Sequence, residues 1–446
     1  MTFRLFLSLL FGSAAPAAGQ DSGWAAYGAD ALGSRWSPLS QITRENVQHL
    51  ELAWHMRTGE ADSSHATAER TSFEATPILL EGALYLSTPT SRVLSLEPET
   101  GRIRWTFDPR IDRSVEYGDF TSRGVSAWTD RRAPEGQMCR QRILLATIDG
   151  RLIALDAARG AVCRGFGRNG TVDLRRGLRN RPFEPAEHEV TSPPTVVNDV
   201  VVVGSAVADN NRIHAASGEV RGYDARTGRR LWSWDPVPQD PRDPAWRTWE
   251  GANAHRTGGA NAWSVIAADP SRDLVIIPTS SASPDYYGGE RLGRNDYANS
   301  VVALRASTGK VIWHFQTVHH DLWDYDNASP PALVSLRREG REVPVVLQAT
   351  KTGMLFVLHR ETGELLFPVE ERTVPASSVP GERAWPTQPF SSLPPLSPHT
   401  RVDPDSVWAL SAGDSAACRS MIQGLRNEGI FTPPSLEGTV VVPGNV

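Results

Sequence analysis

Two aspartates two residues apart are the first feature of this sequence that could do chemistry. They lie in Leu-Trp-Asp-Tyr-Asp at residues 322–326. If this segment is extended, Asp324 and Asp326 point to the same side of the chain. Two carboxylates on one side suit a hard cation, which prefers oxygen ligands. The alternatives are that Asp324 satisfies a turn and that Asp326 is only structural.

A recurring phrase indicates the elements that position these aspartates. Each copy has an apolar strand, a polar turn, usually Thr-Gly, and a second strand that ends in an aromatic residue. Four copies and one degenerate copy lie at residues 94–105, 220–232, 301–313, 356–367 and 153–166. The turn glycines are Gly101, Gly228, Gly309, Gly363 and Gly160.

The repeats predict an all-β fold of the β-propeller type. Their apolar residues alternate with a period of two, which is strand patterning. Glycine in the turn adopts positive φ at no steric cost. One such unit cannot bury its own sheet faces, so the units must stack side by side. We expect the aromatic of each copy to pack between neighbouring blades.

Composition and the N-terminal residues limit the class of protein to which this chain can belong. The chain has 446 residues and a net charge of −5, which gives no basic footprint for nucleic acid. Arg4 followed by the apolar run at 5–11 and small residues up to Gly19 predicts a signal peptide at residues 1–19. We therefore expect export to the periplasm. No other run is long enough to span a membrane, so the mature protein is expected to be soluble or peripheral.

Cysteine usage fits an oxidising compartment. Cys139 and Cys163 bracket one hairpin, with strands expected at 143–148 and 152–156 around Asp149-Gly150, and could pair. Cys418 is then left over. No Cys-x-x-Cys-His haem site occurs, so electrons would have to leave through another molecule.

Longer phrases resemble the pyrroloquinoline quinone (PQQ)-dependent dehydrogenases. The resemblance extends over nearly the whole chain. It begins with Trp-x-x-Tyr-Gly-x-Asp-x-x-Gly-x-Arg at 24–35 and continues with Thr-Val-His-His-Asp-Leu-Trp-Asp-Tyr-Asp at 317–326. The double histidine, Gln-Pro-Phe at 388–390 and Phe-Thr-Pro-Pro at 431–434 most resemble the glucose/quinate/shikimate branch.

This resemblance implies an eight-bladed propeller over residues 20–446, with PQQ and a cation near its axis. The cation would be a divalent ion, calcium or magnesium, or a lanthanide. Family members continue with further blades after Pro443-Gly-Asn445, so we expect this chain to be incomplete at its C-terminus.

The resemblance also implies roles for residues around the two aspartates. Asp324 would be the catalytic base that takes the substrate's hydroxyl proton while hydride passes to the quinone. Lys351 would stabilise negative charge on the cofactor, unless it is a solvated turn lysine. The implied metal ligands are Asp324, Asp326, Asn210 and Ser281. Ser281 stands near an asparagine ligand of the alcohol dehydrogenases.

The implied cofactor site draws on the rest of the chain. Arg123 would bind the carboxylates of the quinone with its planar fork. Thr191 would hydrogen-bond the cofactor edge, and Trp263 would lie beneath its rings, unless Trp263 is a core or blade-docking residue. Asp209 and Asn210 would add polar groups, with a surface turn as the alternative. We expect His319 and His320 to support the site from behind rather than bind metal.

The resemblance implies oxidation of a sugar, polyol or cyclic hydroxy acid by hydride transfer to PQQ. Electrons would then pass to ubiquinone in a membrane or to a cytochrome. Two alternatives remain: a non-catalytic periplasmic propeller scaffold and a truncated, inactive quinoprotein. Such scaffolds lack the Trp-Asp-x-Asp string and the lysine, which favours the enzyme.

Overall fold

The computed structural model describes residues 23–60, 70–118, 120–208, 210, 212–398, 400–407 and 409–443. The signal peptide predicted at residues 1–19 and the predicted cofactor residue Asp209 lie outside this described part.

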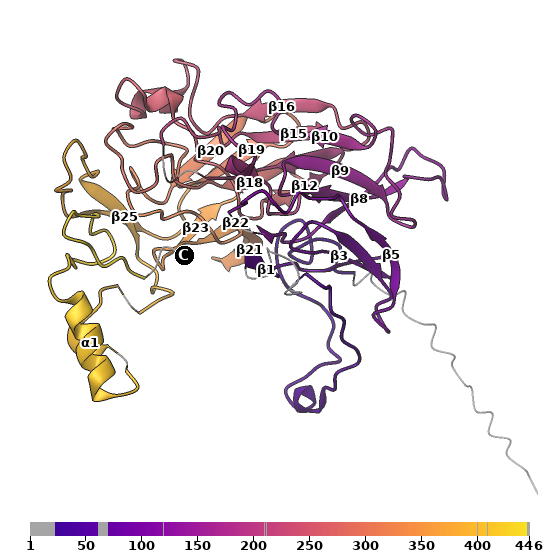
Figure 1. The fold of residues 1–446 in the computed structure, drawn as a ribbon, viewed down its shortest axis with the longest axis horizontal. Helices are drawn as coiled ribbons and strands as arrows, with labels where there is room; N and C mark the ends of the chain where they lie inside the picture. Colours follow the sequence, from indigo (N-terminus) through magenta and orange to yellow (C-terminus); the bar gives the residue numbers. More distant parts are fainter. Residues whose placement is uncertain are drawn as a thin grey trace, which may run out of the picture.

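Antiparallel sheets stand side by side in chain order and form the blades of a propeller (Figure 1). Blade 1 consists of β2 (Ile78–Leu80), β3 (Ala83–Ser87), β4 (Val93–Leu96) and β5 (Ile103–Phe107). Blade 2 consists of β7 (Ser126–Thr129), β8 (Gln141–Ala146), β9 (Arg151–Asp156) and β10 (Thr171–Asp173). Blade 3 consists of β12 (Thr195–Val197), β13 (Val200–Val203), β15 (Val220–Asp224) and β16 (Arg230–Trp234).

Two further blades complete the series in the described residues. Blade 4 consists of β17 (Ala267–Asp269), β18 (Leu274–Pro278), β19 (Ser300–Arg305) and β20 (Val311–Gln316). Blade 5 consists of β21 (Ala332–Arg338), β22 (Arg341–Ala349) and β23 (Leu355–His359), with a bridge from Leu358 to Leu365 in place of a fourth strand. The predicted all-β propeller is confirmed.

Short elements connect and flank the blades. Two-stranded pairs are β1 (Thr71–Ser72) with β6 (Phe120–Thr121), β11 (His188–Glu189) with β14 (Ala206–Val207), and β24 (Val369–Thr373) with β25 (Thr387–Ser391). The 3-10 helices that lie wholly within the described residues are η1 (Val47–His49), η3 (Pro185–Glu187), η4 (Pro244–Thr248), η5 (Ala254–Arg256) and η6 (Pro404–Ser406). The α-helix α1 (Ala412–Ile422) lies apart from the sheets in Figure 1. Among the described helices, none has the length and apolar character needed to cross a membrane.

Apolar clusters between neighbouring sheets hold the blades together. One cluster joins Val202 of blade 3 to Ile277 and Val302 of blade 4. Comparable clusters join blades 1 and 2, blades 2 and 3, and blades 4 and 5. Because both faces of blades 2, 3 and 4 are covered in this way, strands such as β18 are buried along their whole length.

Tryptophans of the repeats pack between neighbouring blades, as predicted, and the structure shows that they lie on the turn glycines of the next blade. The indole of Trp105 in β5 lies on Gly160 of blade 2, and its Nε1 donates to the carbonyl oxygen of Ala157 at 2.9 Å. Trp232 lies on Gly309, and Trp313 on Gly363, with matching bonds to Ala306 and Arg360. A Cβ at Gly160, at φ +68°, would overlap the indole, so glycine is required there.

Two aromatic residues of the repeats differ from this pattern. Phe166 is buried in the cluster shared by blades 2 and 3, but it does not lie on Gly228, which faces Gly167 instead. Phe367 is 37% exposed. The degenerate copy lacks Thr-Gly, and its fourth strand, β10, follows only after an extra turn.

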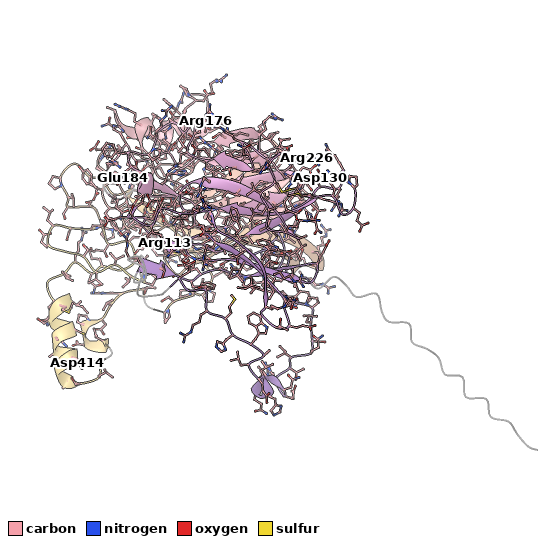
Figure 2. All side chains as sticks on the ribbon, turned by 45° about the vertical axis from the view of Figure 1, so that its right-hand side comes forward. Arg113, Asp130, Arg176, Glu184, Arg226 and Asp414 are labelled. Carbon is pink, nitrogen blue, oxygen red and sulfur yellow. A yellow bond between two sulfur atoms is a disulfide. The ribbon has the colours of Figure 1, made fainter. Side chains whose placement is uncertain are left out.

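A disulfide and an ion pair add cross-links at the outer parts of blades 2 and 3. Cys139 and Cys163 are bonded, as predicted, and Cys418 is free. The hairpin between them turns over residues 147–150, because Gly150 N donates to Thr147 O at 2.9 Å, so β8 ends two residues earlier than expected. Arg226 Nε of blade 3 lies 2.6 Å from Asp130 Oδ2 of blade 2 (Figure 2).

Candidate active site

The segment after β20 turns back on itself and carries both aspartates. Trp323 and Tyr325 stack at 5.6 Å and bond to carbonyls of the C-terminal segment, Trp323 Nε1 to Thr432 O at 2.7 Å and Tyr325 OH to Ile430 O at 2.6 Å. Asp324 has a left-handed φ of +59°, so the segment is not extended at this point and the condition for expecting both aspartates on one side is not met. The two carboxylates nevertheless lie on a common side, because Asp324 and Asp326 face the same partner.

That partner is Lys351, in the turn between β22 and β23. Its Nζ lies 2.9 Å from Asp324 O, 3.4 Å from Asp324 Oδ2 and 3.9 Å from Asp326 Oδ2. Only 11% of the lysine side chain is exposed, so Lys351 is not a solvated turn lysine. One ammonium group thus faces two carboxyl groups, so the cluster has an excess of negative charge whenever both are ionised.

Burial and charge act together on these carboxylates. Burial, followed by the charge of Asp326, raises the pKa of Asp324 far above its ordinary value, and Lys351 only partly opposes this. Burial also raises the pKa of Asp321. A cation placed among these oxygens would favour their ionised forms.

Asp321 is one residue of this site that sequence reasoning missed. It is buried and accepts hydrogen bonds from Tyr325 N at 2.9 Å, from Trp323 N at 3.2 Å and from the hydroxyl of Ser281. It therefore fixes the backbone on both sides of Asp324. The signal was present in His-His-Asp, the phrase that precedes Leu-Trp-Asp.

Asp326 is held by two donors from blade 4 and its flanking segment. Ser281 N donates to Asp326 Oδ1 at 2.6 Å, and Trp263 Nε1 donates to Asp326 Oδ2 at 2.8 Å. The Ser281 hydroxyl itself bonds to Asp321 and accepts from Asn299 Nδ2 at 3.0 Å, so it faces away from Asp326. A metal role for Ser281 stays a prediction.

Trp263 links the aspartates to the other predicted cofactor residues. The Arg123 guanidinium lies 5.1 Å from the indole ring centroid, and its Nη1 donates to Thr191 Oγ1 at 2.7 Å. Arg123 Nη2 also pairs with Glu74 at 2.9 Å. These contacts place Trp263 at the site rather than between blades, and they bring Arg123 and Thr191 together with it.

A small hollow beside Trp263 contains an orphaned polar group. Ser205 lines this hollow, and its Oγ is buried without a hydrogen-bond partner in the described part of the chain. The enclosed space is only about 10 Å³, while Arg123 covers the indole. A planar molecule can therefore stack on this face only if Arg123 moves.

Other predicted residues lie further out. Asn210 is exposed and makes no hydrogen bond to the aspartates among the described residues, so its role stays a prediction. His319 bonds to Gln316 and Glu371, and His320 Nδ1 bonds to Asn295 Oδ1 at 2.9 Å. Both histidines are buried and support the loop. Within the described residues, no group of three or more His, Cys, Asp or Glu side chains forms a ready metal site.

Tyr286 approaches Asp324 from a second loop. Its hydroxyl donates to Asp324 Oδ2 at 3.4 Å, and the side chain is 39% exposed. Burial, followed by the charge of Asp324, raises the pKa of Tyr286 to about 12. No motif in the sequence pointed to this residue.

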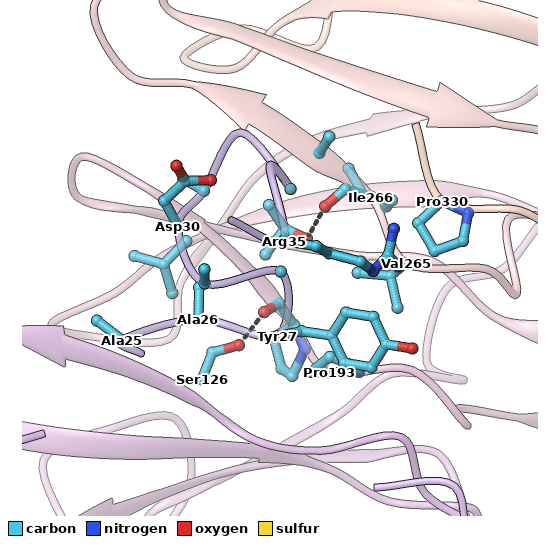
Figure 3. A pocket seen from close by; sticks show the side chains of 18 of the residues that line it. Ala25, Ala26, Tyr27, Asp30, Arg35, Ser126, Pro193, Val265, Ile266 and Pro330 are labelled. Carbon is cyan, nitrogen blue, oxygen red and sulfur yellow. Dashed lines mark hydrogen bonds between the residues drawn. The ribbon is translucent and has the colours of Figure 1, made fainter. Parts of the chain in front are cut away.

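A larger hollow lies away from the carboxylates (Figure 3). It measures about 420 Å³ and is enclosed by the segment 23–35, the ends of the inner strands and Pro330. This segment accepts bonds from three blades: Trp24 O from Leu79 N, Ala31 O from Ala268 N, and Leu32 O from Leu333 N. The opening phrase of the sequence thus fastens blades 1, 4 and 5 together.

The sequence and the fold match a known family. The model of the PQQ "glucose/ethanol/alcohol dehydrogenase, beta-propeller domain" matches residues 24–446. The chain belongs to this family. Quinoproteins of this family use PQQ with a metal ion.

Relatives with assigned activities agree with the resemblance. The chain is 38% identical over 436 residues to the quinoprotein glucose dehydrogenase of Escherichia coli (strain K12), covering 97% of this chain and 54% of that protein. It is 34% identical to the quinate/shikimate dehydrogenase (quinone) of Acinetobacter baylyi, covering 95% and 53%. The solved quinohemoprotein alcohol dehydrogenase from Comamonas testosteroni is 30% identical, with a TM-score of 0.67 and coverage of 84% and 52%. The chain thus spans about half the length of these relatives.

The donor set fits an acidic planar quinone and a cation. Arg123 lies over the Trp263 ring and Lys351 beside Asp326, so each can bind an anionic ligand in exchange for a present carboxylate partner. The Ser205 hydroxyl, which has no hydrogen-bond partner among the described residues, adds a hydrogen-bonding group next to the indole. The excess carboxylate charge around Asp324 suits the cation.

Proposed function

We propose that this chain carries the catalytic site of a PQQ-dependent dehydrogenase that oxidises a hydroxyl group of a sugar, polyol or cyclic hydroxy acid. The observation that carries the proposal is the pairing of Asp324 with Lys351, with Asp326 beside them and Trp263 bonded to Asp326. The names of the relatives support the substrate class.

Each residue has a part in this proposal. Asp324 accepts the hydroxyl proton of the substrate, because its Oδ1 makes no hydrogen bond within the described residues. Lys351 holds Asp324 in place and offers positive charge where negative charge develops. Arg123, Thr191, Trp263 and Asn210 hold PQQ, and Asp324 and Asp326 hold the cation. When bound, PQQ supplies the electrophilic carbonyl that accepts the hydride.

We further propose that the protein is exported to the periplasm and passes its electrons to ubiquinone or to a cytochrome. The predicted leader at residues 1–19 and the disulfide between Cys139 and Cys163 support export. Peripheral association with a membrane is part of the same proposal, because ubiquinone resides there.

Titration of the purified apoprotein with PQQ and calcium, magnesium or a lanthanide tests the function. Dye reduction is followed with glucose, quinate and simple alcohols, and PQQ binding by quenching of tryptophan fluorescence. Asp324→Asn should lower kcat by about 10²- to 10⁴-fold, because the proton acceptor is lost, while PQQ still binds.

Two outcomes would contradict the proposal. Tight PQQ binding without turnover by the unaltered chain would show that the substrate pocket is incomplete. Failure to bind PQQ with any of these cations would instead support the non-catalytic scaffold.

A further inference from the structure

The loop at residues 284–291 places one tyrosine beside the catalytic carboxylate. Tyr286 OH and Lys351 Nζ both lie 3.4 Å from the same oxygen of Asp324, Oδ2. The lysine is 11% exposed, whereas the tyrosine is 39% exposed. The two donors therefore lie on different sides: Lys351 within the protein, and Tyr286 on the side open to solvent.

This loop is fixed relative to Asp324 by a buried arginine. Arg291 is 1% exposed, and its Nη2 donates to Pro284 O at 2.9 Å and to Asp321 O at 2.8 Å. One guanidinium thus joins the tyrosine loop to the aspartate segment. Gly288 N also donates to Glu382 Oε1 at 3.0 Å, and Gly288 packs against the ring of His320. These contacts hold the loop that carries Tyr286 in place beside Asp324.

We propose that Tyr286 determines substrate specificity by binding a second hydroxyl group, adjacent to the one that is oxidised. The inference rests on the proposed function and narrows its substrate class to vicinal diols, whether in sugars, polyols or cyclic hydroxy acids. The reacting hydroxyl binds Asp324 Oδ1, which is free of hydrogen bonds in the described residues, and the neighbouring hydroxyl meets the phenol.

The chemistry of the pair favours a diol over a simple alcohol. The two oxygens of a vicinal diol are separated by about the distance between two hydrogen-bonded atoms. The Asp324 carboxylate and the Tyr286 phenol are also this close together, so each can bind one of the two hydroxyl groups. A phenol both donates and accepts a hydrogen bond. Its present bond of 3.4 Å to Asp324 is long, so it is readily exchanged for a shorter bond to substrate. A simple alcohol offers no such second partner.

Tyr286→Phe and Tyr287→Phe form a matched pair for the test. Each removes one hydroxyl from neighbouring tyrosines, but Tyr287 OH bonds to Pro380 O at 3.3 Å and not to Asp324. The PQQ- and cation-loaded chain is assayed with cyclohexane-1,2-diol and cyclohexanol. Tyr286→Phe should lower kcat/KM for the diol about 3- to 10-fold relative to cyclohexanol, the value of one hydrogen bond. Tyr287→Phe should leave this ratio unchanged.

Ligand-observed NMR of diol and cyclohexanol binding gives a second readout that needs no turnover. The unaltered chain should bind the diol more tightly, and Tyr286→Phe should abolish that preference. An unchanged ratio in Tyr286→Phe, or equal losses on both substrates, would overturn the inference. Absence of turnover by the unaltered chain, with the binding preference intact, would contradict the proposed function alone.

Discussion

Asp321 shows how a carboxylate that touches no substrate can set the geometry of one that does. It accepts two backbone N–H bonds, from Trp323 and Tyr325, on either side of Asp324. The bonds hold a segment whose φ at Asp324 is +59°, a conformation that costs free energy for any residue but glycine. The direction of the Asp324 side chain therefore depends on a neighbour buried behind it.

Replacement of Asp321 should weaken the cation site without removing a ligand. Asp321→Asn keeps the size, but its amide group presents only one acceptor oxygen to the three donors around it. We expect cation affinity to fall about 10- to 100-fold, as is common for residues that orient ligands. Terbium luminescence on titration of the PQQ-loaded chain measures this. The exposed Asp112→Asn should have no effect, and an equal loss there would contradict the argument.

At the scale of elements, the blades are joined by a repeated indole–glycine contact. Trp105, Trp232 and Trp313 each leave their own sheet and lie on the turn of the next one. Each indole N–H bonds to a carbonyl of that turn, so the contact is both apolar and directional. This contact explains the repeated phrase in the sequence, because each unit must supply a glycine to one neighbour and an aromatic residue to the other.

Trp105→Ala should destabilise the chain through the joint between blades 1 and 2. The change removes the packing on Gly160 and leaves the carbonyl of Ala157 without its indole donor. We expect the free energy of unfolding to fall by about 3 kcal/mol. Urea denaturation followed by circular dichroism measures it. Trp36→Ala, at a side chain that is 69% exposed, should change it by less than about 0.5 kcal/mol.

At the scale of the whole molecule, charge pairs also cross between blades. Asp130 of blade 2 accepts from Arg226 of blade 3 through both oxygens, at 2.6 and 2.7 Å (Figure 2). The Arg226 guanidinium lowers the pKa of Asp130 to about 2. The pair thus ties the outer turns of adjacent sheets next to Trp128, at the edge of the apolar cluster that blades 2 and 3 share.

Acid should weaken this joint in a defined pH range. The pKa of Asp130 is lower in the folded protein than in the unfolded chain, where it is about 3.9. The ion pair therefore contributes stability that is fully present above about pH 4 and is lost as the pH falls towards 2. Asp130→Asn should lower the free energy of unfolding by about 1–2 kcal/mol at pH 7. The difference from the unaltered chain should shrink between about pH 4 and pH 2. Asp240→Asn, in an exposed pair within one turn, should have a much smaller effect. A difference that persists at pH 2 would contradict this account.

Much of the fold was determined by the sequence itself. Strand alternation, turn glycines and docking aromatics are local signals with a fixed spacing, and each repeat carries all of them. They predicted the sheets and the packing of aromatics between blades, and the position of Cys139 and Cys163 around one hairpin indicated that these two could pair. The family, too, follows from motifs that are contiguous in the chain.

The arrangement of the site was decided only by the tertiary structure. Trp263, Ser281, Asp326 and Lys351 come from separate segments, and no local pattern gives the distances between them. The left-handed turn at Asp324 arises because the flanking rings of Trp323 and Tyr325 are drawn into an apolar cluster with Phe431. Tyr286 meets Asp324 across two loops that Arg291 joins through the carbonyls of Pro284 and Asp321. Spacing along the chain records local geometry, whereas contacts between distant loops depend on how the blades pack.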